Sequence, residues 1–170
     1  SNRMGKDNMG AAFHSRYPDG LVGQGISAEL IAARWNITRE EQDALAFRSH
    51  VLAAAAERGS TSQDILPVPG RDSGATVACD EGIRRDSTLE KLAGLRSAYK
   101  DPEMQERFPE LRWSVTAGNA SQVSDGACAV LIAEENTALR LGLTPRASVE
   151  AFAVSGDDPL MMLTGIMPAT

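Results

Sequence analysis

The longest amphipathic pattern in the chain lies between Thr38 and Gly59. Apolar residues recur there at the spacing that gathers them on one face of a helix, at Ala44, Phe47, Val51 and Ala55. Thr38 is followed three positions later by Glu41, a capping-box pattern, and glycine is a common residue just past a helix end. The pattern therefore predicts one long helix between these two residues.

A shorter helix is predicted directly before it, from Ser27 to Trp35. Ser27 can cap the first turn, Glu29 lies where the helix dipole favours a carboxylate, and Asn36 follows the last turn. Residues 1–25 are rich in glycine, methionine and aspartate, which predicts a loop. The GLVGQG run in this loop has neither the glycine order nor the preceding strand of a dinucleotide-binding turn.

The pattern breaks into short polar stretches between the long helix and residue 113. Residues 61–80 hold two prolines and two glycines, which predicts a loop with minor strands. Asp86 or Ser87 can cap a short helix from about residue 88 to residue 94. Residues 101–113 are polar with two prolines, and they are expected to form a surface excursion.

A strand–helix–strand pattern follows. The apolar run Ala127–Ala133 has no polar alternation, as expected of a strand that is buried on both faces. Glu134 and Glu135 begin a short helix that Gly142 closes, and residues 149–154 predict a further strand. This order predicts an α/β fold with a parallel sheet covered by helices, and it places Cys128 in a buried strand.

Composition narrows the class of protein. Apolar residues make up 42% of the chain, which is enough for a core, and no run of about 18 apolar residues predicts a membrane span. A net charge of -6 argues against a general nucleic-acid binder. Cys79 and Cys128 are far apart without metal-ligand spacing, which indicates no metal site and a reducing cytoplasm.

Two features have both a structural and a functional interpretation. The stretch TAGNASQVSDGACAVLI, residues 116–132, has little side-chain volume: it either forms a tight turn that needs Gly118 and Gly126, or leaves room for a ligand. Four cations, Arg84, Arg85, Lys91 and Arg96, gather in an otherwise acidic chain. Charge alone favours a solvated, salt-bridged face over an anion site for a phosphorylated ligand. His50 has no second His, Cys or carboxylate with which to form a recognisable catalytic set, which favours a surface role.

Four stretches together resemble the thiolase family, in the order in which that family has them. TAGNASQVSDGA matches the signature T-A-G-N-(S/A)-S-x-x-N-D-G-A, with Ser124 at the usual Asn position. Residues 26–56 resemble a thiolase segment of two successive helices, and residues 80–99 resemble the stretch that ends in L-x-x-L-(R/K)-P-(A/V)-F. DDPLMMLTGIMPAT is similar to G-x-(D/E)-P-x-x-M-G-x-G-P-x-P-A.

The resemblance implies a function and a division into domains. Thiolases cleave 3-ketoacyl-CoA by thiolysis or condense two acyl-CoA molecules, and their fold has five layers, αβαβα. On this alignment residues 3–113 form a mainly helical loop domain that covers CoA, residues 114–141 end the N-terminal half, and residues 142–170 begin the C-terminal half. The resemblance further implies acyl-CoA as substrate, no covalently bound cofactor, and a homodimer or homotetramer when intact.

The resemblance also assigns site residues. Arg84, Lys91, Ala98, Tyr99 and Ser121 match positions that contact CoA in the family, Lys91 least closely. Gln24 occupies a place near the acyl chain, where Gly23 replaces a family His, which leaves the acyl specificity open. The family's nucleophilic Cys, its Asn, its His of G-H-P and its Cys of C-x-G match nothing here, so no catalytic residue is assigned and the chain alone is expected to be inactive.

Three hypotheses remain after these observations. The chain is a segment of an acyl-CoA acyltransferase, a stand-alone CoA-binding module derived from the same fold, or a structural element without a ligand. A nucleophilic Cys upstream and the two downstream motifs in the gene would select the first. A stop codon directly after Thr170 would favour the others.

Overall fold

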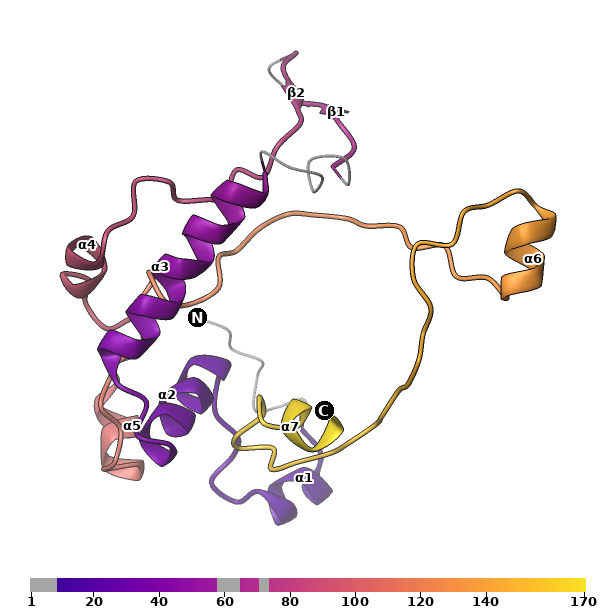
Figure 1. Ribbon diagram of the computed structural model, residues 1–170. Coiled ribbons are helices and arrows are strands. Elements are labelled where there is room, and N and C mark those ends of the chain that lie inside the picture. The colour runs from indigo at the N-terminus through magenta and orange to yellow at the C-terminus, as the bar shows by residue number, and fades with distance from the viewer. Residues whose placement is uncertain (1–8, 58–64, 71–73) are drawn as a thin grey trace.

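Helix α2 (Gln24–Arg34) lies at the centre of the packed part of the molecule, and the long helix α3 (Arg39–Ala56) follows it (Figure 1). The computed structural model describes residues 9–57, 65–70 and 74–170. The other described helices and strands are α1 (Ala11–Arg16), β1 (Val68–Pro69), β2 (Thr76–Val77), α4 (Leu89–Ala93), α5 (Pro102–Arg107), α6 (Glu135–Arg140) and α7 (Ile166–Ala169).

The predicted start of α3 is confirmed. The Glu41 N–H donates to Thr38 Oγ1 at 3.2 Å, and the Thr38 N–H donates to Glu41 Oε2 at 2.8 Å, so both halves of the capping box are formed. The predicted stop at Gly59 lies outside the described residues. The recurring apolar residues do not form a buried face: Val51 is half exposed, and the buried side chain of α3 is Asp43.

Helix α2 ends where predicted but begins earlier. Asn36 adopts a left-handed conformation with φ of 54°, and the N–H groups of Asn36 and Ile37 donate back into the last turn, a Schellman ending. The predicted cap is wrong: the helix begins at Gln24, and Ser27 is fully buried inside it. The Ser27 hydroxyl instead donates to the carbonyl of Leu160 at 2.7 Å and ties the C-terminal segment to α2.

Three short helices refine the predictions for the polar stretches. Helix α4 is capped by Thr88, whose Oγ1 accepts the Lys91 N–H at 3.2 Å, rather than by Asp86 or Ser87. Helix α1 lies inside the predicted N-terminal loop, and α5 inside the predicted surface excursion. Asp101 caps α5 by accepting two N–H groups, and a proline follows it at the first helical position.

The core combines segments that are far apart in sequence. Ile26 and Leu30 of α2 form a buried cluster with Leu111, and partly buried residues pack around it at Val22, Met104, Phe108, Trp113, Leu160 and Met161. The stretch that was expected to be a surface excursion therefore supplies much of the core. Amphipathic spacing was too short there to reveal a helix of six residues.

The predicted parallel sheet is absent from the described residues. The sheet they form has two strands, β1 and β2, which pair antiparallel with Val68 opposite Val77. The runs Ala127–Ala133 and Val149–Val154 are extended but exposed, and neither has a strand beside it. A strand requires a neighbour for its backbone N–H and C=O groups, and apolar sequence alone does not supply one. Cys128 is exposed, so the predicted burial of Cys128 is wrong. Cys79 is exposed as well.

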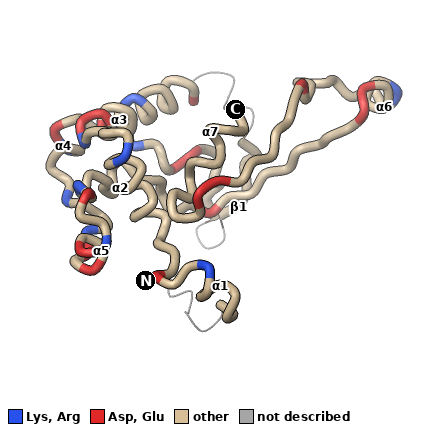
Figure 2. Tube along the Cα trace, turned by 90° about the horizontal axis from the view of Figure 1, so that it is seen from below, with Lys and Arg blue, Asp and Glu red and all other residues tan. Residues whose placement is uncertain are grey.

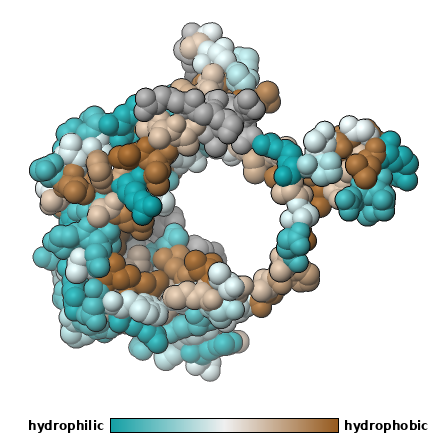
Figure 3. Space-filling view, in the orientation of Figure 1, coloured by the Kyte–Doolittle hydropathy of each residue, from teal (hydrophilic) through white to brown (hydrophobic). Residues whose placement is uncertain are grey.

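Both apolar runs belong to an excursion that carries α6 at its far end (Figures 1 and 2). Helix α6 confirms the short helix predicted after Glu134, whose carboxylate accepts the N–H groups of Asn136 and Thr137, and Gly142 follows it with φ of 69°. These hydrogen bonds lower the pKa of Glu134. Hydrophobic residues are visible along the excursion in the space-filling view (Figure 3). No helix in the described part of the chain is long and apolar enough to cross a membrane.

A buried carboxyl group joins α2 to the segment that precedes the TAGN sequence. Glu29 is fully buried, and its Oε2 accepts the Ser114 N–H at 2.9 Å and the Ser114 hydroxyl at 3.3 Å. Its Oε1 accepts the Val115 N–H at 2.7 Å. These bonds offset the cost of burying the group and fix the backbone from which the TAGN sequence begins.

The Glu29→Gln variant tests this contact. A glutamine side chain has one acceptor oxygen and one NH₂ donor. Its NH₂ must therefore face one of the backbone N–H groups, and two donors cannot form a hydrogen bond with each other. We expect the free energy of unfolding to fall by about 1.5–3 kcal/mol, the range for a hydrogen bond to a charged group. Urea denaturation measures the change, with Glu106→Gln on the exposed face of α5 as control. Equal midpoints for Glu29→Gln and the wild type would show that these bonds contribute nothing net.

Candidate ligand-binding site

The TAGN sequence forms a turn that is held by its own asparagine. The Thr116 N–H donates to Asn119 Oδ1 at 2.8 Å, and the Gly118 N–H donates to Thr116 Oγ1 at 3.1 Å. The Asn119 side-chain amide donates to the carbonyl of Ser114 at 3.1 Å and to Asp43 Oδ1 at 2.9 Å. Asp43 thus anchors the turn to α3.

Asp43 also connects the turn to α4 through a cation. Arg39, one turn earlier on α3, donates from Nε to Asp43 Oδ2 at 2.7 Å. Its Nη2 donates to the carbonyl of Leu95 at 3.2 Å and to that of Leu92. One buried carboxyl group on α3 therefore fixes the end of α4 and the TAGN turn relative to each other.

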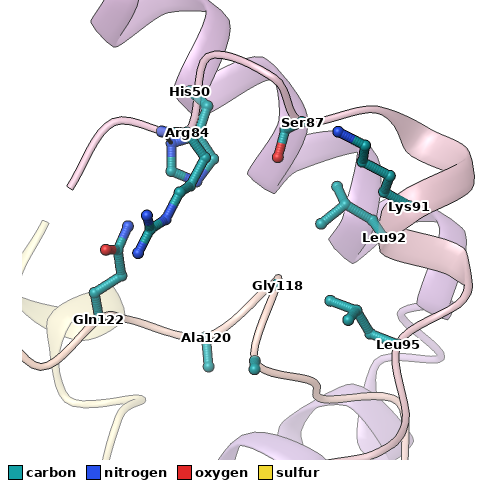
Figure 4. Close-up of a pocket in the computed structure, with 10 residues that line it drawn as sticks. His50, Arg84, Ser87, Lys91, Leu92, Leu95, Gly118, Ala120 and Gln122 are labelled. Carbon is teal, nitrogen blue, oxygen red and sulfur yellow. Dashed lines mark hydrogen bonds between the residues drawn. The ribbon is translucent and has the colours of Figure 1, made fainter. Parts of the chain in front are cut away.

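A pocket opens between these fixed parts, with a volume of about 260 Å³. We call it the basic pocket, and its lining residues are His50, Arg84, Ser87, Lys91, Leu92, Leu95, Ala117, Gly118, Ala120 and Gln122. Its polar side chains come from α3, the loop before α4, α4 itself and the segment after the turn (Figure 4). Leu92 and Leu95 form an apolar wall beside them.

The cations of the basic pocket differ in their partners. The Lys91 ammonium donates to the Asp86 carboxylate at 2.9 Å and to the Asp86 carbonyl at 2.6 Å. The hydrogen bond between the two side chains and the charge of Lys91 lower the pKa of the exposed Asp86 carboxyl. The Arg84 guanidinium takes part in no salt bridge among the described residues, and in Figure 4 it points toward Gln122. An anionic ligand therefore meets one guanidinium that forms no salt bridge with a described carboxylate, although its charge also contributes to lowering the pKa of Asp86.

A second pocket of about 350 Å³ adjoins the first. We call it the helix pocket, because α3 contributes five of its lining residues, and the complete lining is Gln42, Leu45, Ala46, Ser49, His50, Gly118, Asn119, Ala120, Ser121 and Gln122. The two pockets share a wall made of His50, Gly118, Ala120 and Gln122. A ligand longer than either pocket can extend across this wall from the cations to Ser121.

The small side-chain volume of the turn has a packing reason at Gly118. A Cβ at this position would lie 2.5 Å from Leu92 Cδ2 and 2.6 Å from Leu95 Cδ1. Gly126 has nothing within 4 Å of the same point, and neither glycine has a positive φ. The expectation that both glycines serve backbone conformation is wrong. Gly118 lets the apolar wall of the basic pocket approach the turn.

Comparison with known proteins agrees with this arrangement of motifs. The family model described as "Thiolase, N-terminal domain" matches residues 12–136. The chain belongs to the thiolase family. It is 42% identical to a 3-ketoacyl-CoA thiolase of Shewanella frigidimarina, over 96% of this chain and 42% of that protein. It is 38% identical to an acetyl-CoA acetyltransferase of Paracoccus denitrificans, over 98% of this chain and 39% of that protein.

The fold is also similar to that of a solved thiolase. The crystal structure of the Bacillus anthracis acetyl-CoA acetyltransferase matches with a TM-score of 0.72 and 36% identity, over 87% of this chain and 37% of that one. The fold is therefore thiolase-like, although the described residues are mostly helical. The chain spans about two fifths of the length of these relatives.

The structure brings together three of the residues that the thiolase resemblance assigned to CoA. Arg84 and Lys91 line the basic pocket, and Ser121 lines the helix pocket next to it. Ala98 and Tyr99 line neither of these pockets. The Ala98 N–H donates to the carbonyl of Val115 at 2.9 Å, which places the pair beside the strand-like entry to the TAGN turn.

Gln24 and Tyr99 lie close together, and neither lines the pocket that contains Arg84 and Lys91. A Cβ on Gly25 would lie 2.4–2.5 Å from three atoms of the Tyr99 ring, so the ring packs directly on the backbone beside Gln24. Gln24 is exposed at the first position of α2. All six assignments remain predictions.

Several residues that organise this thiolase site were not singled out from sequence. Asp43 was interpreted only as part of the long helix, and Glu29 only as a first-turn carboxylate. A signal existed for each: Glu29 is the one charged residue in ISAELIAA, and Asp43 follows Arg39 at the four-residue spacing of helical ion pairs. Gln122, which donates to the carbonyl of Gly82 at 2.6 Å, gave no such signal.

The Gly118→Ala variant tests the close approach of the wall. Its new methyl group must displace Leu92 and Leu95, so we expect the free energy of unfolding to fall by about 1–3 kcal/mol, the cost of overpacking. Gly126→Ala, in the same signature but in open space, should change it by less than about 0.5 kcal/mol. Thermal or urea unfolding of both variants measures the difference, and equal stabilities would show that the wall yields at no cost.

Proposed function

We propose that this chain is the CoA-binding central segment of an acyl-CoA acyltransferase of the thiolase type. The observation that carries the proposal is the adjacency of the two pockets: Arg84 and Lys91 lie on one side of a shared wall and Ser121 on the other. CoA has this polarity, with phosphates at one end and a narrow pantetheine arm at the other. Guanidinium and ammonium groups bind phosphate through charge-assisted hydrogen bonds.

The roles of the residues follow from this orientation of the ligand. Arg84 contacts the nucleotide phosphates, and Lys91 does so in competition with Asp86. Ser121 donates a hydrogen bond to an amide of the pantetheine arm, and Ala98 and Tyr99 continue the path toward the acyl group near Gln24. We assign residues 3–113 to the loop domain that covers CoA, residues 114–141 to the end of the N-terminal half, and residues 142–170 to the start of the C-terminal half.

The exposed apolar runs support the view that more protein packs on this chain. Val130, Leu131 and Ile132 are 77–81% exposed, and Phe152 and Val154 are at least 90% exposed. Contiguous apolar surface of this kind marks an interface. We propose that the remainder of a thiolase chain covers these runs as neighbouring strands, that the intact enzyme is a cytoplasmic homo-oligomer, and that the 170-residue chain alone has no thiolase activity.

Arg84→Ala tests the phosphate contact in the intact enzyme. A contact remote from the reacting atoms binds the ground and transition states alike, so we expect the Michaelis constant for CoA substrates to rise with less effect on turnover. Arg96→Ala is the matched control, because Arg96 belongs to the same run of cations but lines neither pocket. Steady-state kinetics in the thiolysis direction measures both, and an unchanged Michaelis constant in Arg84→Ala removes this residue from the CoA site.

Ser121→Val tests the pantetheine contact. The substitution removes a hydroxyl and adds volume in the helix pocket, and a hydrogen bond lost in a buried complex costs about 1–3 kcal/mol of binding free energy. Ser124→Val, in the same signature but outside both pockets, should retain wild-type affinity. Calorimetric titration with CoA compares them. Wild-type affinity in Ser121→Val would show that the arm follows another path.

A further inference from the structure

His50 joins the two pockets and contacts the cation that faces the ligand. It lies on α3 and contributes to the lining of both pockets. Its Nδ1 accepts the backbone N–H of Arg84 at 3.2 Å, across 34 positions of sequence. In Figure 4 its ring lies directly beside Arg84. No spacing or motif in the sequence connects these two residues.

The direction of this hydrogen bond makes the ring nitrogen the acceptor. A ring nitrogen accepts an N–H only while it carries no proton, so the contact needs an unprotonated Nδ1. The Arg84 backbone is held on both sides, since its carbonyl accepts the Ser87 N–H at 3.3 Å. The long side chain of Arg84 therefore leaves from a fixed backbone, while its guanidinium has no carboxylate partner among the described residues.

We propose that His50 is a positioning residue that anchors the Arg84 backbone through Nδ1 and so directs the guanidinium into the basic pocket. This rests on the proposed function, in which the guanidinium binds a CoA phosphate. An arginine side chain loses rotational freedom when it binds, and a fixed starting point reduces that loss. The loop has a second tie at the end of α3, the ion pair of Arg85 with the C-cap residue Glu57, so His50 is not its one attachment there.

Two substitutions of His50 separate the effect of its hydrogen-bond acceptor from the effect of its size. His50→Asn places Oδ1 where Nδ1 was and keeps the acceptor, whereas His50→Leu fills a similar volume without one. We expect CoA to bind His50→Asn within about threefold of wild type and His50→Leu about five- to tenfold more weakly, which corresponds to one hydrogen bond of about 1 kcal/mol. In an Arg84→Ala background, His50→Leu should cause no further loss, because the two residues act through one contact.

Hydrogen exchange makes the anchor measurable without a ligand. Mass spectrometry of a peptide that includes Arg84 should show slow exchange in wild type and His50→Asn and faster exchange in His50→Leu. Equal exchange in all three proteins overturns the anchor. An equal loss of CoA affinity from His50→Leu with and without Arg84 also overturns the proposal, since His50 then contacts the ligand itself. Failure of the wild type to bind CoA, with exchange as expected, overturns the proposed function and leaves the anchor established.

Discussion

The arrangement of this site depends on two buried carboxyl groups that bind backbone and side-chain donors from distant segments. Glu29 on α2 accepts hydrogen bonds from the backbone N–H groups of Ser114 and Val115. Asp43 on α3 accepts one from the side-chain amide of Asn119. A buried carboxyl group without such partners is costly, so each group selects the one approach of the chain that satisfies it. The TAGN turn is thereby fixed against two helices at once, and Arg39 extends the same constraint to the end of α4.

This constraint explains why a small-residue signature lines a pocket. The turn approaches α4 so closely that Gly118 leaves no space for a Cβ beside Leu92 and Leu95. Beyond the turn, Ala120 and Ser121 have short side chains; Ala120 lines both pockets, and Ser121 lines the helix pocket. Close packing on one side and open volume on the other both follow from how the carboxyl groups hold the backbone.

Several local signals in the sequence predicted local structure, although the caps expected at Ser27 and at Asp86 or Ser87 are wrong. The capping box at Thr38, the helix end at Asn36 and the short helix after Glu134 each depend on residues within a few positions of one another, and each is confirmed. Contacts across the chain were predicted poorly. The apolar spacing in α3 predicted a helix but not the burial of Asp43, which depends on Asn119, 76 positions away.

The strand predictions also failed because a strand depends on contacts across the chain. Residues 127–133 have the composition of a buried strand, but a strand is defined by its neighbours, and none lies beside this run in the described chain. For the site, the family motifs named Arg84, Lys91 and Ser121, which do line adjoining pockets. No motif pointed to the partners that hold them, because those partners are specified by geometry rather than by spacing.

The cation cluster shows how one stretch supports two interpretations together. Arg85 pairs with Glu57 and Lys91 with Asp86, so these two members fit the salt-bridged face that charge alone favoured. Arg84 differs, because its backbone is held by His50 and Ser87 while its guanidinium pairs with no described carboxylate. An ion pair neutralises a charge that would otherwise attract a ligand, whereas an anchored and unpaired guanidinium retains it. Arg85 and Lys91 therefore pair within the described chain, whereas Arg84 forms no described salt bridge and lines the basic pocket, where an anion can reach it.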